Sequence, residues 1–392
     1  MTHYNYLIIG GGMAAAAAVS GLRDHDKDGS IGIISAEHEP PYDRPPLSKK
    51  LWSGRKTLEA IYHELPADVA VHSGRKAQQL DPQQKRVLDN RGHPFTYDQL
   101  LLATGSTPRR FPFRADNVIY FRTATDYRHL RQLANNHDRF AVVVGGFIGS
   151  EMAAALAMQG KQVTLIFPDS GIGSRLFPAD LSAFLNDYYR QKGVEVLAET
   201  AVTNITGSRT DLVVALDDGR SLQVHGVVAG IGVTPNTALA EAAGLDVDNG
   251  ILVNEKLQTS DPHIYAAGDV ANYPDVLLDT RRRVEHEDAA NSMGKTAGQA
   301  MAGASITYDY SPLFYSDLFD LGYEAVGELD ARLELVTDWQ EPYQKGVIYY
   351  LRGDRVCGVL LWNTWDQVEA ARTLIAERAP LSRAELVGRL SG

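Results

Sequence analysis

Two glycine-rich stretches of the sequence have the spacing that binds a dinucleotide pyrophosphate. The first comprises Gly10, Gly12, Met13, Ala14 and Ala15, and the second comprises Gly145, Gly146, Phe147, Ile148 and Gly149. In such a turn the first glycine allows a tight bend, the second lets the backbone approach the phosphates, and a small third residue lets the helix pack on the strand. The phosphates then lie at the positive end of the helix. Two copies of the pattern predict two nucleotide sites.

Each stretch stands between elements that could position it. In the first copy we predict a strand, a helix and a strand at residues 6–9, 16–22 and 31–34, and in the second copy at residues 140–144, 150–158 and 163–167. A strand–helix–strand unit of this kind belongs to a parallel sheet. The sequence therefore predicts two separate parallel-sheet domains.

The second stretch departs from the pattern at Val144, which stands where the first glycine belongs. A β-branched residue adopts a positive φ only at a cost. We therefore expect this turn to differ slightly from the first while still binding a nucleotide.

An acidic residue follows the second strand of each unit. Glu37 follows the first, and Asp169 follows the second, directly after Pro168. A carboxylate at this place accepts hydrogen bonds from a ribose diol. Since it also repels a 2′-phosphate, we expect NADH to be preferred over NADPH. The alternative for Asp169 is an ordinary turn residue.

Two further strand ends indicate a flavin. Residues 97–106 end in a small-residue turn with Thr104 and Gly105, and residues 262–270 end in Gly268 and Asp269. The turn glycine allows the chain to pass close to a ligand, and Asp269 could accept hydrogen bonds from ribityl hydroxyls. In this order, together with the twin turns, these segments predict an FAD site.

The composition excludes several classes of function. The 392 residues carry a net charge of −11, which argues against a nucleic-acid partner. The run Arg281-Arg282-Arg283 could be a solvated loop or a phosphate site. The single cysteine, Cys357, excludes an internal redox dithiol, and we expect it to be a small core residue. We expect no membrane span, no metal site and, because no targeting segment is visible, a cytoplasmic protein.

Several longer motifs carry a family resemblance. They lie at residues 41–49, 281–288, 321–327, 349–352 and 358–363. With the twin turns, they make the chain similar to the apoptosis-inducing-factor-like branch of the FAD-dependent pyridine nucleotide-disulfide oxidoreductases, which is ferredoxin-reductase-like and has no redox disulfide. The expected fold is α/β, with two Rossmann-like domains of the glutathione-reductase type and a C-terminal α+β domain. We expect the FAD-binding domain to comprise residues 1–115 and 240–310. The NAD(H)-binding domain should comprise residues 116–239, and the C-terminal domain residues 311–392.

The resemblance also implies site residues. For FAD it implies Arg44, Lys49, Ala77, Arg122, Asp269, His286 and Glu287, and Tyr315 in place of the family's stacking tryptophan. For NAD it implies Phe147, Ile148, Asp169, Arg175, Gly232, Glu285, Glu324 and Asn363. Lys49 and Glu151 should form an ion pair near flavin N5, with His286 beside the rings. Ala36 replaces the family's usual acid, so Glu37 must serve instead.

Simpler interpretations stay open for three of these residues. Phe147 could be core packing, Glu151 a helix N-terminal acid favoured by the dipole, and His286 a capping or core histidine. The expected function is an NADH oxidoreductase that passes electrons through FAD to an acceptor, which could be a quinone, oxygen or a small iron–sulfur protein. The alternatives are a ferredoxin or rubredoxin reductase, and a slow NADH-responsive redox scaffold whose homodimerisation changes on reduction.

Overall fold

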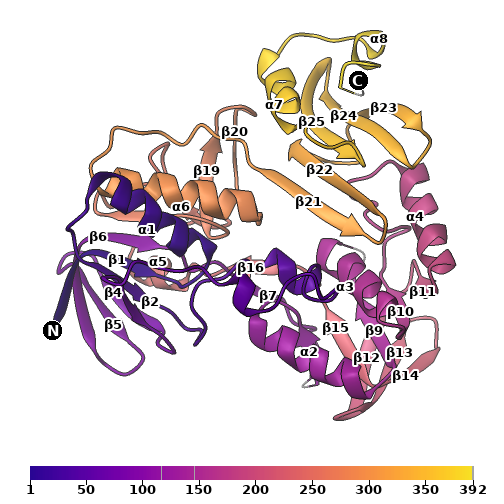
Figure 1. Cartoon of the computed structure of the whole chain (residues 1–392), viewed down its shortest axis with the longest axis horizontal. Coiled ribbons are helices and arrows are strands. Elements are labelled where there is room, and N and C mark those ends of the chain that lie inside the picture. Colours follow the sequence, from indigo (N-terminus) through magenta and orange to yellow (C-terminus); the bar gives the residue numbers. More distant parts are fainter. Residues whose placement is uncertain (116, 145, 391–392) are drawn as a thin grey trace. The chain divides into compact units, whose positions relative to one another are not determined.

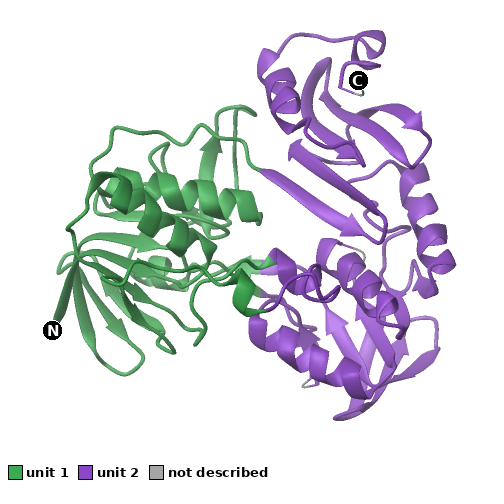
Figure 2. Cartoon of the chain, in the orientation of Figure 1, with its two compact units in different colours: residues 1–44, 58–107, 234–312 green, residues 45–57, 108–233, 313–392 purple. Residues whose placement is uncertain are grey.

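The computed structural model describes residues 1–115, 117–144 and 146–390, and the chain forms two compact units (Figures 1 and 2). Unit 1 contains residues 1–44, 58–107 and 234–312, and unit 2 contains residues 45–57, 108–233 and 313–392. Neither unit is a continuous stretch of sequence. The division into three domains stays a prediction, and Gly145 of the second glycine stretch lies outside the described residues.

A seven-stranded sheet forms the centre of unit 1. Its strands run in the order β3 (Ala70–His72), β2 (Ile31–Ile34), β1 (Thr2–Ile9), β6 (Pro94–Leu102), β5 (Arg86–Asp89) and β4 (Ala77–Asp81), and β18 (Ile264–Ala266) also pairs with β6. β1 is parallel to both β2 and β6, with Ile9 beside Ile34 and Leu102. The parallel unit predicted around the first glycine stretch is confirmed.

Two helices of unit 1 are in backbone contact. They are α1 (Met13–His25), which follows the first glycine stretch, and α6 (Glu287–Met301). A Cβ added at Gly294 would lie 2.3 Å from the carbonyl oxygen of Ala14, and one at Gly298 would lie 2.2 Å from that of Ala18. Only glycine allows this approach, so the α6 sequence is adapted to α1.

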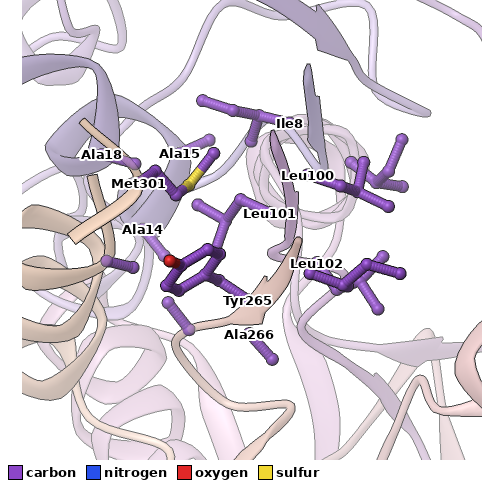
Figure 3. Packing of buried hydrophobic residues seen from close by; sticks show 14 of the residues in the cluster. Ile8, Ala14, Ala15, Ala18, Leu100, Leu101, Leu102, Tyr265, Ala266 and Met301 are labelled. Carbon is purple, nitrogen blue, oxygen red and sulfur yellow. The ribbon is translucent and has the colours of Figure 1, made fainter. Parts of the chain in front are cut away.

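The main core of unit 1 lies where these elements meet. Figure 3 shows Ile8 of β1, Leu101 of β6 and Tyr265 of β18 with alanines of α1 and Met301 of α6. Strands buried on both faces read as continuous apolar runs. This explains why β1, β6 and β18 could be recognised from the sequence.

Unit 2 contains a second parallel sheet. Its order is β11 (Val194–Leu197), β10 (Gln162–Ile166), β9 (Arg139–Val143), β15 (Gly226–Ala229) and β8 (Val118–Tyr120). Its helices are α2 (Ala124–Asn136), α3 (Phe147–Met158) and α4 (Ala179–Gln191), and β12 (Val202–Ser208), β13 (Asp211–Leu216) and β14 (Ser221–Val224) form an antiparallel sheet. α3 begins three residues earlier than predicted, because the glycine turn leads straight into it.

The end of unit 2 is an antiparallel sheet with two helices. Its order is β21 (Leu313–Leu318), β22 (Leu321–Gly327), β25 (Arg355–Trp362), β24 (Lys345–Arg352) and β23 (Glu334–Glu341), followed by α7 (Val368–Glu377) and α8 (Arg383–Leu386). Cys357 is buried on β25, which confirms it as a core residue. Two Rossmann-like sheets and this C-terminal sheet confirm the predicted α/β fold class.

The remaining elements are short. They are η1 (Pro45–Ser48), η2 (Glu59–Ile61), β7 (Ser106–Pro108), β16 (Val233–Pro235), α5 (Ala238–Ala242), β17 (Ile251–Leu252), β19 (Ala271–Asp275) and β20 (Thr280–Arg282). Within the described ranges, none of the helices combines the length and the apolar character needed to cross a bilayer.

Candidate nucleotide and flavin sites

The first glycine turn packs against Ala103 at Gly10 and faces a guanidinium at Gly12. Gly10 has φ +120°, and a Cβ there would lie 2.0 Å from the carbonyl oxygen of Ala103. Gly12 is the N-cap of α1 and makes no side-chain capping bond. Instead, Arg44 Nη2 lies 4.0 Å from the position of a Cβ on Gly12. Helix amides together with an arginine suit a pyrophosphate, so these residues fit the phosphates of FAD.

Glu37 and Tyr42 orient Arg44. Arg44 Nη2 donates to Glu37 Oε1 at 2.5 Å, and Nη1 donates to the Tyr42 hydroxyl at 3.1 Å. The same hydroxyl donates to Glu37 Oε2 at 2.6 Å. The structure therefore brings together Glu37 and Arg44, both of which the sequence analysis had assigned to FAD. Binding of a ribose by Glu37 stays a prediction.

Two strand ends that are far apart in the sequence meet beside this turn in unit 1. The Ser106 hydroxyl, next to Thr104 and Gly105, donates to Asp269 Oδ2 at 2.7 Å. Asn236 makes two hydrogen bonds to the same turn. Its backbone carbonyl accepts from Thr104 Oγ1 at 2.9 Å, and its side-chain amide donates to the backbone carbonyl of Thr104 at 2.8 Å. Asp269 is therefore fixed next to the turn that was expected to pass close to a flavin.

His286 is the N-cap of α6, immediately before Glu287. The pKa of His286 is lowered to about 4, mainly by burial and also by the Arg282 charge, while Asp269 opposes the shift. The imidazole is therefore neutral at pH 7. A neutral ring next to an aromatic cofactor can stack or donate a hydrogen bond without adding charge.

The three consecutive arginines are parts of the protein framework. Arg281 donates to the carbonyl of Asn272 at 2.8 Å, Arg282 lies 2.7 Å from Asp275, and Arg283 lies 2.7 Å from Glu285. Arg281 and Arg282 lie on β20 and not in a loop, and the phosphate-site alternative stays open. The pairing with Arg283 fixes Glu285 one residue before His286.

In unit 2 a buried carboxylate receives three donors. Lys49 Nζ lies 2.5 Å from Glu151 Oε1, Ser316 donates to the same oxygen at 2.5 Å, and Ser48 donates to Oε2 at 2.6 Å. The side chains of Lys49 and Glu151 are 8% and 2% exposed. Lys49 Nζ also lies 5.0 Å from the centre of the Tyr315 ring. The pair is present as expected, and its role towards flavin N5 stays a prediction.

The serines of this network were missed by the sequence analysis. Ser48 precedes Lys49 in the chain, which was a usable signal because η1 places adjacent residues on one short turn. Ser316 lies on β21, more than 160 residues from Glu151, and no local pattern points to it.

The described residues of the second glycine turn are Val144 and those from Gly146 onwards. Val144 itself has φ +151°, in the region that Gly10 occupies, and Gly146 is the N-cap of α3, again without a side-chain capping bond. The φ values of +151° at Val144 and +120° at Gly10 are compatible with the expected slight difference between the two turns, and nucleotide binding at the second turn stays a prediction. A neighbouring glycine, Gly149, leaves the space that the valine side chain needs.

Phe147 and Ile148 begin α3 at this turn. The Phe147 ring lies 5.5 Å from Phe314 and 6.4 Å from Tyr323, both on the C-terminal sheet. Ile148 is 39% exposed. Phe147 thus packs in an aromatic cluster but stays half-buried, so core packing is compatible with the NAD contact that the resemblance implies.

The acidic residue after β10 is next to a cation. Arg175 Nη2 lies 3.4 Å from Asp169 Oδ1, and its side chain is 81% exposed. Gly232, with φ +93°, follows β15, and its carbonyl accepts the amide of Arg109 at 2.9 Å. These residues lie after the ends of parallel strands, where α/β sheets bind their ligands.

Two residues expected at the NAD site belong to the C-terminal part of unit 2, with Glu324 on β22 and Asn363 directly after β25. Glu324 Oε2 is buried and has no hydrogen-bond partner among the described residues. Burial, with help from Asp366, raises the pKa of Glu324. Asn363 accepts from the Gly322 amide at 2.7 Å and donates to the Gln344 carbonyl at 2.8 Å. Glu324 is available to a ligand, whereas the side chain of Asn363 holds the sheet together.

The other expected residues fall into both units. Ala77 begins β4 in unit 1, and Met13 and Ala14 form the first turn of α1. Arg122 lies in unit 2, and its amide donates to Asp126 at the start of α2. No group of three or more metal-binding side chains occurs in the part of the chain that the structure describes.

Comparison with known proteins agrees with this architecture. The model of the family "Pyridine nucleotide-disulphide oxidoreductase" matches residues 4–294, and that of "Apoptosis-inducing factor, mitochondrion-associated, C-term" matches residues 337–377. Apoptosis-inducing factor 1 of Dictyostelium discoideum is 35% identical, over 96% of this chain and 79% of that protein. Putidaredoxin reductase of Pseudomonas putida is 31% identical, over 96% of this chain and 93% of that protein.

Solved structures show the same likeness. A putidaredoxin reductase in covalent complex with putidaredoxin superposes with a TM-score of 0.90 at 31% identity, covering 98% of this chain and 95% of that one. The chain therefore belongs to the pyridine nucleotide-disulphide oxidoreductase family, as an FAD- and NAD(P)-dependent oxidoreductase of the ferredoxin-reductase and apoptosis-inducing-factor type.

Proposed function

We propose that this chain oxidises NADH and passes the electrons to a small iron–sulfur protein. The observation that carries the proposal is the repetition of one arrangement. Each unit has a glycine turn at a helix N-terminus without a side-chain cap, and each has an acidic residue after the second strand. Two such arrangements accommodate two dinucleotides.

In this proposal FAD is held by unit 1 through the Gly10–Gly12 turn, Arg44 and Asp269. When bound, the flavin supplies the acceptor for the hydride of NADH. Lys49 and Glu151 hold a fixed pair of charges in a buried place, and Ser48 and Ser316 prevent the carboxylate from rotating. Fixed dipoles need no rearrangement during a reaction, which is how such a pair favours transfer.

NADH is the proposed donor because of Asp169. Its carboxylate accepts hydrogen bonds from a ribose diol and repels a 2′-phosphate. Arg175 beside it opposes this effect, but its side chain is 81% exposed and thus screened by solvent. The carboxylate therefore decides the preference.

The proposed acceptor rests on the extent of the likeness. The chain covers 93% of a putidaredoxin reductase but 79% of an apoptosis-inducing factor. A net charge of −11 opposes an acidic partner. However, Arg109, Arg110 and Arg114 are exposed within six residues of unit 2. A local basic stretch can steer an acidic partner even on an acidic protein.

Anaerobic titration with NADH tests the donor half of the proposal. Bleaching of the flavin absorbance at one equivalent of NADH is expected, with NADPH much slower. Mixing the reduced enzyme with small iron–sulfur proteins in stopped flow then tests the acceptor half. Reoxidation should slow with increasing salt, whereas reoxidation by quinone or oxygen alone would contradict it.

The match at residues 337–377 favours a second candidate function. This candidate is an NADH-responsive redox scaffold, which turns over slowly and whose homodimerisation changes when NADH reduces it. Light scattering with and without NADH decides between the two. A constant mass with fast transfer to an iron–sulfur protein excludes the scaffold.

A further inference from the structure

Val144 takes a backbone conformation that β-branched residues avoid. It follows the last residue of β9, as Gly10 follows the last residue of β1. Its φ is +151°, and that of Gly10 is +120°. The two repeats thus bend in the same region of conformational space, although one of them has a valine at the bend. Such strain persists only where the surroundings enforce it.

Two glycines make room for the side chain of Val144. A Cβ added at Gly149 would lie 2.2 Å from Val144 Cγ1 and 2.3 Å from its carbonyl oxygen. A Cβ added at Gly230 would lie 3.2 Å from the same Cγ1. A methyl group on Gly149 therefore cannot coexist with Val144 in this geometry.

The first repeat shows the opposite distribution of sizes. Counted from the helix starts Met13 and Phe147, the position of Gly149 corresponds to Ala15. Counted from the strand register, the position of Gly230 corresponds to Ala103, because Ile9 pairs with Leu102 as Val143 pairs with Ala229. In the first repeat the bend residue is glycine and its two neighbours are alanines. In the second repeat the bend residue is valine and its two neighbours are glycines.

We infer that Val144 and Gly149 form a size-matched pair that holds the second turn in its nucleotide-binding conformation, so that Val144 is a positioning residue for the pyridine nucleotide. The stiff isopropyl group, packed between glycines, restricts a turn that glycine would leave mobile. The amides at the start of α3 are then prearranged. This inference rests on the assignment of the second turn to the pyridine nucleotide proposed above.

A double-mutant cycle tests the pair in the FAD-loaded full chain. The proteins are the wild type, Gly149→Ala, Val144→Gly and the double variant, which recreates the glycine and alanine of the first turn. The probe is tetrahydro-NAD, a reduced analogue that cannot transfer hydride, and the readouts are its dissociation constant, the FAD content and the melting temperature.

Gly149→Ala should raise the dissociation constant of the analogue about tenfold or more, since overpacking displaces the turn. In the Val144→Gly background the same substitution should change the affinity by less than about threefold, because a glycine removes the Cγ1 contact and its wider range of φ and ψ lets the carbonyl of residue 144 move away from the new methyl group. FAD content should stay constant in all four proteins, because the FAD turn belongs to the other unit. Gly230→Ala is the graded control and should be milder than Gly149→Ala, given 3.2 Å instead of 2.2 Å.

Equal effects of Gly149→Ala in the two backgrounds would overturn the inference. If Gly149→Ala alone is insoluble, recovery of soluble protein in the double variant supports the pair, and its failure to recover overturns it. A wild type that neither binds the analogue nor is reduced by NADH would contradict the proposed function. In that case the coupling would still be measurable in the melting temperatures, so the two failures are distinguishable.

Discussion

Lys49 Nζ lies 2.5 Å from Glu151 Oε1, and both side chains are almost completely buried. Breaking a buried pair leaves one charge without compensation. Lys49→Met should therefore lower the free energy of unfolding by about 3–5 kcal/mol. It should also slow flavin reduction by NADH about 100-fold, because a small displacement of reacting groups is costly.

The matched control is the neighbouring lysine. Lys50 is exposed, so Lys50→Met should change the free energy of unfolding by no more than about 0.5 kcal/mol. Urea unfolding and anaerobic stopped flow measure the two quantities. Equal unfolding free energies and equal rates of flavin reduction in the two variants would show that Lys49 has no role in the site.

Arg44 should determine how tightly FAD is held. Arg44→Met removes the guanidinium beside Gly12 and leaves Glu37 facing the turn, so the carboxylate would repel the pyrophosphate. We expect the FAD content of the purified protein, measured by absorbance, to fall several-fold. Arg91→Met, at an exposed hairpin of the same unit, should keep full occupancy. Full occupancy in Arg44→Met as well would show that the phosphates bind elsewhere.

Asp169 should set the choice between the two pyridine nucleotides. Asp169→Asn keeps the size of the side chain but removes its charge. The ratio of kcat/KM for NADH to that for NADPH should fall about tenfold, since repulsion of the 2′-phosphate is lost while Arg175 stays. Asp187→Asn on α4 controls for the loss of one charge from unit 2. An unchanged ratio would make Asp169 an ordinary turn residue.

His286 should make the protein less stable in acid. Burial lowers its pKa to about 4, from 6.5 in an unfolded chain. Between these values the unfolded state binds more protons than the folded state. The free energy of unfolding therefore decreases as the pH falls from 6.5 to 4, and for this half-buried group the loss is about 1–3 kcal/mol.

His286→Gln should remove that part of the pH dependence, which urea unfolding of the flavin-free protein at pH 7 and pH 5 would show. The exposed His25 of the same unit is the control, and His25→Gln should keep the full dependence. The same slope in His286→Gln would mean that other groups cause the acid lability.

The sequence predicts the parallel units well because strands buried on both faces, such as β1 and β9, are continuous apolar runs. The Lys49–Glu151 pair could be expected only from the family motifs, since 102 residues separate the two. Ser316 could not be predicted, because its contact with Glu151 arises from tertiary packing. For Val144 the local rule indicates that a positive φ is costly, but it could not predict that Gly149 leaves room for the valine side chain, because that contact depends on how α3 packs against the strand end.

The backbone contact between α1 and α6 has a consequence for protein synthesis. The first helix, α1, leaves the ribosome long before Gly294 and Gly298. These two glycines lack the side chains that would clash with the backbone of α1. β18, which pairs with β6, also arrives late. Until about residue 300 has been translated, the sheet and helices around the first nucleotide turn are incomplete, and their apolar strands are exposed to solvent. A nascent chain of this protein should therefore need a chaperone for most of its elongation, and flavin should be captured only near the end of translation.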